Sequence, residues 1–526
     1  MDSLPVTDRR RLLQAVAAAA MGLASWGCAT RQVRFAEDPF ALGIASGSPA
    51  ADSVVLWTRL LAAAGAAELG PAPIAVRWEM AHDRAFSRIA QSGEVHALAE
   101  LAHSVHAQAT GLQSDRWYFY RFIAGGAVSP VGRTRTLPAP EAAVGKLRLA
   151  YASCQRWEHG FFSAYRHMRE EDLDAVLFLG DYIYEYPNAA RAVRVPTGGW
   201  VLSLEDYRQR YALYKGDADL QAMHAACPWI MTWDDHEVQN DYAGLRAGDS
   251  GPAVADFKAR RAAAYQAFYE HMPLRASVLT RALAGLSAGA EFRLYSQLRF
   301  GRLATLNLLD TRQYRDPQVC SGGGRLGSGF VRPSACPDWN DPARTLLGAA
   351  QERWLDQALS ADHAGWSIIA QQTLFGAREL PSAAGPSFWN DGWDGYGAAR
   401  SRLTQSLQQH KVANPVLFGG DVHENWVGHV KADYGRPDSA TLGVEFCGTS
   451  LTSRSGTNAK VPQRLAGNPH FVFADAERRG YGVAEFTPGQ LTTSLRVVDD
   501  VTRPETTIGT LARFAVQAGR PQVERA

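Results

Sequence analysis

The chain contains 526 residues, of which 46% are hydrophobic and 20% are charged. At roughly 150 residues per domain this length predicts two to four domains, and the apolar fraction excludes an intrinsically disordered protein. The formal net charge of +1 argues against nucleic acid or an anionic membrane as the main partner, because either would call for a basic surface. After residue 30 no apolar run approaches the length of about 18 residues that spans a bilayer.

The first 30 residues have the pattern of an export signal. Arg9 and Arg10 precede a short, alanine-rich and weakly hydrophobic stretch at residues 15–24, which is typical of the bacterial twin-arginine route. We therefore expect residues 1–30 to be a signal peptide that the twin-arginine export machinery recognises, and the mature protein to be periplasmic or extracellular. Two alternatives stay open: a buried N-terminal helix, and lipidation at Cys28, where the preceding residues match a lipobox poorly.

Export changes how the cysteines are interpreted, because disulfides persist in oxidising compartments. Five cysteines follow the signal: Cys154, Cys227, Cys320, Cys336 and Cys447. Cys320 and Cys336 flank a loop rich in Gly, Ser and Pro, and we expect them to form a disulfide. The odd number leaves at least one thiol for another role.

Residues 39–137 are expected to form a β-sandwich domain of the fibronectin type III or immunoglobulin-like kind. Short β-branched or alternating runs, such as residues 53–58, are separated by segments rich in Gly, Pro and Ala. Leu112 precedes Tyr118 by six residues in an alternating strand, which resembles the tyrosine-corner region of such sandwiches. The change of composition at residues 138–143 predicts a linker.

From residue 146 onward, apolar runs of strand length alternate with helical periodicity, which predicts an α/β domain over residues 146–500. Residues 501–526 are expected to be a C-terminal tail or helix. The expected helices cover residues 256–272, 346–359 and 396–409. The expected strands cover residues 147–152, 175–179, 229–233, 303–309, 366–370 and 415–418. Each strand leads into a polar cluster, and ligands of open α/β sheets lie beyond the carboxyl ends of the strands, so we expect a ring of ligands at one edge.

Several of these strand ends carry side chains that bind metals. Asp181 follows a buried strand behind Gly180 and can bridge two cations, and Tyr184 can reach the same metal. A phenolate must lose a proton with a pKa of about 10, which favours a highly charged ion such as Fe³⁺. The Gly-Asp-x-x-Tyr string alone also fits a turn with an exposed tyrosine. Together with Asp235-His236-Glu237 and Asp421-Val422-His423 it indicates a metal centre.

In this order the motifs resemble those of the calcineurin-like, binuclear metallophosphoesterases, which include the purple acid phosphatases. Three positions depart from the purple acid phosphatase pattern: Cys154 replaces an Asp, Asp235 an Asn, and Asp421 a His. These replacements resemble the PhoD-type alkaline phosphatases, as do the segments at residues 151–155, 233–238, 310–315, 393–396 and 420–425. The resemblance covers nearly the whole chain.

The resemblance implies two kinds of metal ion. Its Fe³⁺ site would consist of Cys154, Asp181, Tyr184 and His423. Its Ca²⁺ site would share the bridging carboxylate and consist of Asp181, Asp235 and Asp421. The ligand set stays open at one position, for which the candidates are Gln371, Gln372 and Asn240.

The implied activity is that of an alkaline phosphatase, in which a metal-bound hydroxide attacks the phosphorus of a phosphomonoester or phosphodiester substrate. His236, next to Asp235, is the candidate proton donor to the leaving group; alternatively it only hydrogen-bonds a carboxylate. Arg156 and Arg312 are candidate phosphate clamps, because a guanidinium can bind a phosphoryl group through two hydrogen bonds. A structural ion pair is the alternative for each arginine.

Two other functions remain in view. A phospholipase D-like or teichoic-acid-type phosphodiesterase could use the same scaffold, and relative turnover of bis- and mono-nitrophenyl phosphate would distinguish it. A non-catalytic surface-binding protein would be expected to have lost metal ligands, whereas every ligand position here carries a competent side chain. We expect a monomer with no transmembrane segment in the mature protein.

Overall fold

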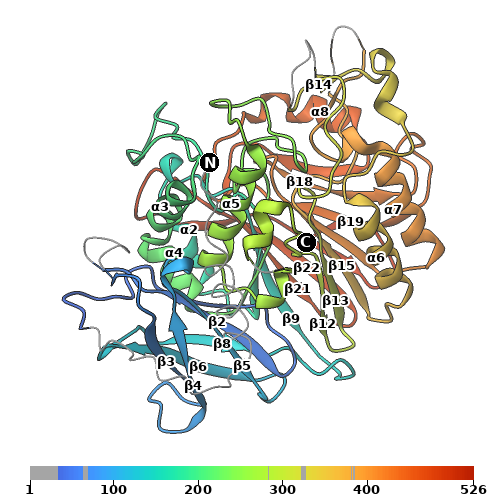
Figure 1. The fold of residues 1–526 in the computed structure, drawn as a ribbon. Helices are drawn as coiled ribbons and strands as arrows, with labels where there is room; N and C mark the ends of the chain where they lie inside the picture. The colour runs from blue at the N-terminus through green and yellow to red at the C-terminus, as the bar shows by residue number, and fades with distance from the viewer. Residues whose placement is uncertain (1–33, 63–68, 282, 322–326, 381, 383–384) are drawn as a thin grey trace. The chain divides into compact units, whose positions relative to one another are not determined.

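The computed structural model describes residues 34–62, 69–281, 283–321, 327–380, 382 and 385–526. The expected signal peptide, with Arg9, Arg10 and Cys28, lies outside these residues. None of the described helices is both long enough and apolar enough to cross a membrane. The chain divides into two units, whose helices and strands are labelled in Figure 1. The first consists of Met1–Leu137, Val201–Ile230 and Val254–Arg293, and the second of Pro138–Trp200, Met231–Ala253 and Leu294–Ala526.

The first unit contains two sets of antiparallel strands around one core. One set has the order β1-β2-β5, with β1 at Ile44–Gly47, β2 at Ser53–Arg59 and β5 at Ser104–Thr110. The other has the order β4-β3-β6-β7 with β8 beside β6, and its strands are β3 (Ile74–Ala81), β4 (Ile89–Ala97), β6 (Trp117–Ala124), β7 (Ala127–Val128) and β8 (Gly132–Arg135). Alternate residues of β6 are buried, so Tyr118 and Phe122 join Leu56 and Val76 in the core.

Three helices belong to this first unit although they lie within the range expected for the α/β domain. They are α3 (Leu204–Lys215), α4 (Ala218–His224) and α5 (Phe257–His271). The ring nitrogen of Trp57 on β2 donates to the carbonyl of Glu270 on α5 (3.0 Å). His106 on β5 stacks on Tyr269 at a ring-centroid distance of 4.3 Å. The strands therefore bury a second face against α5, which continuity along the sequence does not reveal.

The second unit contains two larger sheets whose central strands are parallel. The first has the order β24-β23-β22-β21-β9-β10, with β9 (Leu147–Ala152), β10 (Ala175–Phe178), β21 (Arg479–Phe486), β22 (Gln490–Val498), β23 (Ile508–Gln517) and β24 (Glu524–Arg525). The second has the order β12-β13-β15-β17-β19-β18-β20, with β12 (Ser296–Phe300), β13 (Ala304–Leu308), β15 (Trp366–Ala370), β17 (Pro415–Gly419), β18 (Asn425–Lys431), β19 (Thr441–Cys447) and β20 (Phe471–Asp475). The strand expected at residues 229–233 is the short β11 (Trp229–Met231), and Thr232 after it donates its N–H to Phe178 (3.0 Å).

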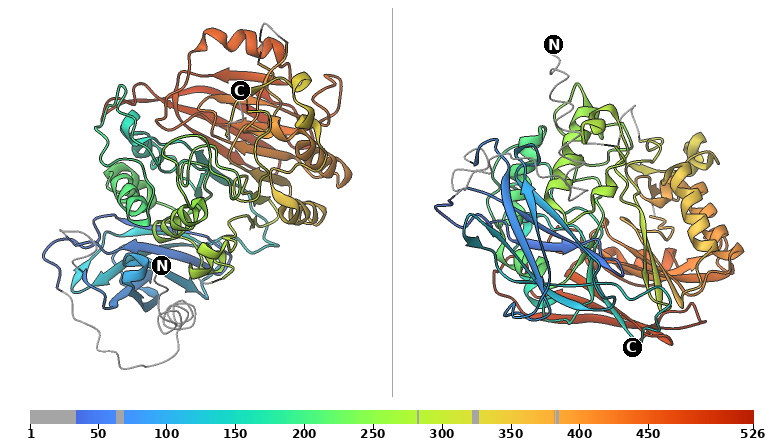
Figure 2. Two further views of the ribbon diagram at one scale, coloured as in Figure 1. Left: turned by 45° about the horizontal axis from the view of Figure 1, so that its top comes forward. Right: turned by 60° about the horizontal axis from the view of Figure 1, so that its bottom comes forward.

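Aromatic side chains fill the space between the two sheets of the second unit. Tyr151 on β9 meets Phe418 on β17 at 4.6 Å, and Phe486 on β21 meets Trp366 on β15 at 5.7 Å. The opposite face of the seven-stranded sheet buries residues such as Leu417 against α6 (Gly348–Ser360) and α7 (Gly397–Gln409). Figure 2 shows these two helices, in yellow to orange, along that face. The short helix α2 (Ala164–Met168) follows β9, and α8 (Val461–Gly467) precedes β20.

The expectation of a tail or helix at residues 501–526 was wrong. Residues 508–517 form β23, in which Ala512, Phe514 and Val516 are buried and their neighbours are more exposed. This period of two is the signature of a half-buried strand. The strand pairs with β22 and extends the sheet.

The expected disulfide between Cys320 and Cys336 is confirmed, with a Cα–Cα distance of 5.9 Å. The bridge lies near a two-stranded ribbon made of β14 (Phe330–Val331) and β16 (Phe388–Trp389). Cys154 is buried and is not part of a disulfide.

Candidate metal centre and active site

All the candidate site residues lie in the second unit, where they occupy tight turns at strand ends. Cys154, Asp181, Asp421 and His423 have φ angles of 59°, 58°, 64° and 56°. This left-handed region is uncommon for residues other than glycine, and such strain concentrates at functional sites. Gly180 is required beside Asp181, since its φ is +108° and a Cβ there would lie 2.5 Å from the Cβ of Asp234.

One group of side chains could hold a metal with sulfur, oxygen and nitrogen. Ligand atoms of Cys154, Asp181 and His423 lie within 4.8 Å of one another. The phenol of Tyr184 donates to Oδ2 of Asp181 (2.9 Å) and lies 3.2 Å from Nε2 of His423. Because Nδ1 of His423 bonds the Arg454 carbonyl (2.9 Å), Nε2 is the nitrogen left for this group. The structure thus brings together all four residues of the expected iron site.

A second group shares Asp181 with the first. Atoms of Asp181, Asp235 and His236 lie within 4.8 Å of one another. Asp421 falls outside these closely spaced groups; its Oδ2 accepts a hydrogen bond from the hydroxyl of Thr373 (2.6 Å). Burial and the nearby Asp235 raise the pKa of Asp421 to about 6, although Arg312 opposes the shift. Asp421 is therefore close enough to the group to interact with it electrostatically.

A third group contains two carboxylates that the sequence reasoning missed. Atoms of Asp235, Asp241 and Asp391 lie within 4.8 Å of one another, and all three residues are buried. Asp241 follows the same strand end as Asp235, and its φ of 59° repeats the strain of the other candidates. Asp391 lies two residues before Trp393, in a loop with no strand pattern to draw attention to it. Spacing from a strand end could have indicated Asp241 but not Asp391.

The residues present fit metal ions. Oδ1 of Asp181, Oδ1 of Asp235 and Oδ2 of Asp234 are buried and have no hydrogen-bond partner among the described residues. Burying an unpaired carboxylate is costly unless a cation or donor compensates it. Burial also raises the pKa of the Cys154 thiol and the Tyr184 phenol well above their ordinary values, so ionised forms of these ligands require a bound cation.

His236 is held by a buried carboxylate. Its Nδ1 lies 2.7 Å from Oε2 of Glu185, and the other oxygen of Glu185 accepts the N–H of Asn240 (2.7 Å). Burial alone would lower the pKa of His236, but Glu185, Asp235 and Asp181 outweigh it and keep that pKa well above the ordinary value. The carboxylates around His236 therefore favour the charged imidazole over the neutral one.

The two candidate arginine clamps differ in their surroundings. The guanidinium of Arg312 is fully buried, and its ion pairs are with Asp234 (2.5 Å) and Asp391 (2.8 Å). Its contacts are therefore those of a structural ion pair, which was the alternative to a phosphate clamp. The guanidinium of Arg156 lies 3.9 Å from the ring centroid of Tyr184 and 4.4 Å from that of Tyr186, so it is held against a candidate metal ligand.

The candidates for the remaining ligand are largely engaged elsewhere. The Gln371 amide bonds to Thr373 and accepts the ring N–H of Trp393 (3.1 Å). The Gln372 amide donates to Thr232, Trp233 and Leu309 and accepts the N–H of Thr311. Both side chains are fully buried and bind backbone or neighbouring groups. The backbone N–H of Asn240 donates a hydrogen bond to the carboxylate of Glu185, which fixes the position of Asn240.

Glu237 joins two of the motif loops, a role that the sequence reasoning did not assign. Its carboxylate accepts the backbone N–H groups of Asp181 (3.2 Å), Tyr182 (2.5 Å) and Asp234 (2.8 Å). Hydrogen bonds from three backbone donors fix the turn after β10 against the turn after β11. The Asp-His-Glu motif therefore supplies both candidate site residues and the carboxylate that positions them.

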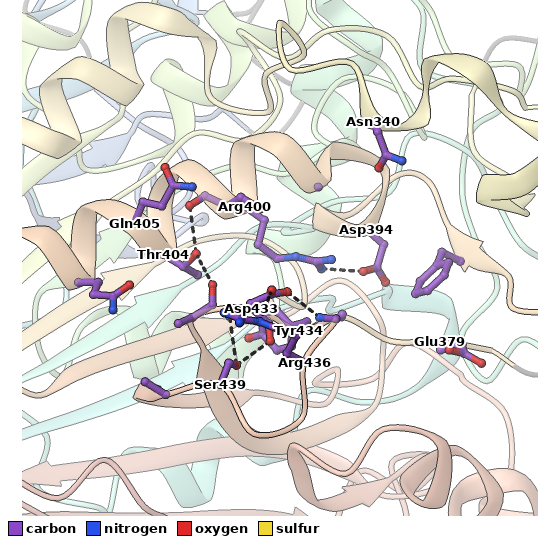
Figure 3. Close-up of a pocket in the computed structure, with 18 of the residues that line it drawn as sticks. Asn340, Glu379, Asp394, Arg400, Thr404, Gln405, Asp433, Tyr434, Arg436 and Ser439 are labelled. Carbon is purple, nitrogen blue, oxygen red and sulfur yellow. Dashed lines mark hydrogen bonds and ion pairs between the residues drawn. The ribbon is translucent and has the colours of Figure 1, made fainter.

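A separate cavity of about 700 Å³ lies beside α7 and the turn between β18 and β19. None of its lining residues belongs to the three metal groups. Four of its charged side chains form two ion pairs, Arg400 with Asp394 (2.6 Å) and Arg436 with Asp433 (3.0 Å), as Figure 3 shows. The cavity is therefore distinct from the candidate metal centre.

Two face-to-face sheets with these donor groups at their strand ends define a metallophosphoesterase-like protein. The solved structure of purple acid phosphatase PPD1 from yellow lupin (Lupinus luteus) seeds matches with a TM-score of 0.54 and 11% identity, over 90% of this chain and 73% of that one. At this identity the match establishes the fold alone. The metallophosphoesterase-type architecture expected from the sequence is thereby confirmed.

The chain belongs to the PhoD-like phosphatase family. The PhoD-like phosphatase model matches residues 149–495, and the model of the PhoD-like phosphatase N-terminal domain matches residues 27–138. Alkaline phosphatase D of Bacillus subtilis (strain 168) is 44% identical over 494 residues, which are 92% of this chain and 82% of that protein. The solved structure of PhoD is 42% identical and has a TM-score of 0.87, over 94% of this chain and 93% of that one. The chain is therefore a phosphoric ester hydrolase, which sets aside the non-catalytic alternative, and its family implies bound metal ions.

Proposed function

We propose that the chain is an exported alkaline phosphatase that hydrolyses phosphomonoesters and phosphodiesters at a centre of Fe³⁺ and Ca²⁺. The observation that carries this proposal is the set of buried carboxylate oxygens without partners on Asp181, Asp235 and Asp234, next to a sulfur, phenol and imidazole group. No single ion suits both the carboxylate oxygens and the group of sulfur, phenol and imidazole donors equally well. The two groups of donors therefore favour two different ions.

The donor atoms favour these two ions. A thiol, a phenol and an imidazole meet at Cys154, Tyr184 and His423, and a trivalent ion best compensates ionisation of the first two. Asp235 and Asp421 offer only carboxylate oxygens, and Ca²⁺ accepts several such ligands at irregular geometry. When bound, the ions would neutralise the carboxylates, draw in the phosphoryl oxygens and supply a water of lowered pKa.

The chain's own residues would then position the substrate and move a proton. Glu185 holds Nδ1 of His236 (2.7 Å) and leaves Nε2 to donate a proton to the departing alkoxide oxygen. Arg156, packed on the rings of Tyr184 and Tyr186, would bind a phosphoryl oxygen. Arg312 would act indirectly, by compensating the charges of Asp234 and Asp391.

The test is to strip the purified protein of metal with a calcium-preferring chelator and to add back Ca²⁺, Mg²⁺, Mn²⁺ or Zn²⁺ separately. Ca²⁺ should restore most phosphatase activity, and Asp421→His should shift the preference toward Zn²⁺ or Mn²⁺, because imidazole suits those ions. The iron site should give a visible thiolate and phenolate absorption band. Cys154→Ser and Tyr184→Phe should each shift or abolish it. Full activity of a colourless, iron-free protein, or better rescue by Zn²⁺ than by Ca²⁺, would refute the assignment.

The domain assignment and the cellular location are part of the same proposal. We propose a fibronectin III or immunoglobulin-like sandwich at residues 39–137, followed by a catalytic domain at residues 146–500. The tyrosine-corner expectation is supported by the N–H of Gln113, which donates to the Tyr118 hydroxyl (3.0 Å).

Export of a monomer by the twin-arginine route can be tested with Arg9→Lys/Arg10→Lys, which should leave the precursor in the cytoplasm. Relative turnover of bis- and mono-nitrophenyl phosphate measures the preference for diesters.

A further inference from the structure

One edge of the metal centre carries an arginine that the proposed reaction does not use. Arg454 follows Ser453, whose hydroxyl donates to the phenol oxygen of Tyr184 (2.7 Å). The carbonyl of Arg454 accepts a hydrogen bond from Nδ1 of His423 (2.9 Å). The backbone of Arg454 is therefore fixed directly against two candidate iron ligands, while its side chain extends away from them.

The guanidinium of Arg454 binds the backbone at a second arginine, Arg191. Its Nη1 donates to the carbonyl of Ala190 (2.8 Å), and its Nη2 donates to the carbonyl of Arg191. Arg191 is exposed, and its φ of 57° is unusual for a residue with a side chain. Among the described residues, neither guanidinium has a carboxylate within ion-pair distance.

The surroundings of this pair are also positive. Burial, Arg156, Arg454 and Arg479 together lower the pKa of His159 to about 3, so this imidazole is neutral. His159 is 7% exposed; its Nδ1 accepts the N–H of Arg454 (3.2 Å), and its Nε2 is buried with no partner among the described residues. The carboxylate of the neighbouring Glu158 accepts a hydrogen bond from the backbone N–H of Asn188 (3.1 Å). It forms no ion pair with the described residues. Arg156, Arg454 and Arg479 therefore outnumber the carboxylate of Glu158, so that the balance of charge on this side of the centre favours an anion.

We propose that Arg191 and Arg454 form a second anion subsite, which holds a phosphate group carried by the substrate beside the phosphoryl group that is hydrolysed. The inference rests on the proposed phosphatase centre and names its preferred substrates as bisphosphorylated compounds. A guanidinium has five N–H donors, and the hydrogen bonds of Arg454 to the two backbone carbonyls use two of them. Arg191 lies beside it, and paired guanidinium donors match the oxygens of a phosphate.

The test uses the full metal-loaded enzyme and pairs of substrates that differ in one phosphate. Bisphosphates of straight-chain α,ω-diols of increasing length are compared with the corresponding alkyl monophosphates, and the ratio of their kcat/KM values is measured. The wild-type ratio should peak at one chain length and decline as salt is added. Arg191→Gln and Arg454→Gln should each lower the peak ratio about three- to tenfold, and Arg454→Lys should restore part of it. Turnover of the monophosphates should change much less.

The matched control is Arg436→Gln, which removes the same charge from an exposed site at the far end of the β18–β19 hairpin. It should leave the ratio unchanged. An unchanged ratio in both subsite variants would overturn the subsite while leaving the phosphatase intact, whereas a wild-type enzyme that hydrolyses neither substrate would overturn the proposed function. If the variants lose only inhibition by added inorganic phosphate and keep the ratio, the arginines bind free phosphate and the substrate subsite is refuted.

Discussion

Replacing Arg312 by Met should destabilise the protein far more than it weakens substrate binding. The guanidinium is buried and bonded to Asp234 and Asp391, with Asp235 at 3.5 Å. Removing one partner of a buried ion pair leaves an uncompensated charge and typically costs about 3 to 5 kcal/mol. Methionine fills a similar volume but offers no donor, so the carboxylates would bear this cost.

The structure also limits the size of the effect. Asp234 would lose its ion-pair partner entirely, since Arg312 is the arginine that pairs with it in the described chain. Asp391 would keep Arg315 at 2.8 Å and a hydrogen bond from Gln318 (2.5 Å). The loss is therefore that of one broken pair, about 3 to 5 kcal/mol in the free energy of unfolding, and not twice that value.

Urea unfolding of Arg312→Met and wild type, with chelator and with added Ca²⁺, measures this loss. The difference should shrink with Ca²⁺, because Asp235 and Asp391 belong to one candidate metal group and a cation there would replace part of the lost charge. Arg436→Met, which removes an exposed arginine paired with Asp433, should cost less than about 0.5 kcal/mol. Unchanged stability with a KM for phosphoesters raised more than tenfold would refute the reasoning and make Arg312 a phosphate clamp.

Three further changes have outcomes that the structure specifies. Cys320→Ser removes the disulfide to Cys336, which lies 16 residues away in the sequence, and should lower the free energy of urea unfolding by about 3 kcal/mol. A reductant should lower the stability of the wild type by the same amount. An unchanged stability in either experiment would contradict this prediction. Burial lowers the pKa of Lys215 from 10.5 to about 7, so the unfolded chain binds more protons between those pH values and stability should rise from about pH 7 to pH 10.5, by up to about 5 kcal/mol. Lys215→Met should flatten this rise, and an equally steep curve would disprove the assignment. Glu185→Gln should leave the fold intact, because the amide is isosteric, yet lower kcat about 10- to 100-fold by releasing His236; an unchanged kcat would argue against His236 as proton donor.

Much of the architecture of the second unit could be predicted because the local periodicity of apolar residues indicates its strands and helices. The helix expected at residues 396–409 is α7 at Gly397–Gln409, and the strand expected at residues 366–370 is β15 at Trp366–Ala370. Parallel strands are buried on both faces and therefore read as short apolar runs. Each run ends in a polar residue, which predicted a ring of ligands at one edge, and the resemblance of the motifs to the PhoD-type alkaline phosphatases implied which side chains would meet.

Contacts between distant segments could not be predicted in this way. The packing of α5 on β2 and β5 depends on Trp57, His106 and their partners some 160 to 210 residues away, and no period in either segment encodes it. Asp391 reaches the metal groups from a loop, so no strand end indicated it. β23 is a different case: its alternation was present in the sequence, and the expectation of a tail overlooked it.

The strained turns give a physical reason why the proposed centre would depend on its ions as well as on its fold. Cys154, Asp181, Asp421 and His423 each adopt a left-handed backbone, which costs on the order of 1 to 3 kcal/mol per residue. The same turns bring carboxylates together that the surrounding protein donors leave partly unsatisfied. Both costs are present in the folded chain and absent from the unfolded one, so they oppose formation of the centre until cations bind to it. Residue type alone does not reveal such turns, because only the complete fold can hold a cysteine or histidine in this conformation. The sequence therefore predicts the ligands, whereas the structure shows the strained turns and unpaired carboxylate oxygens that bound cations would compensate.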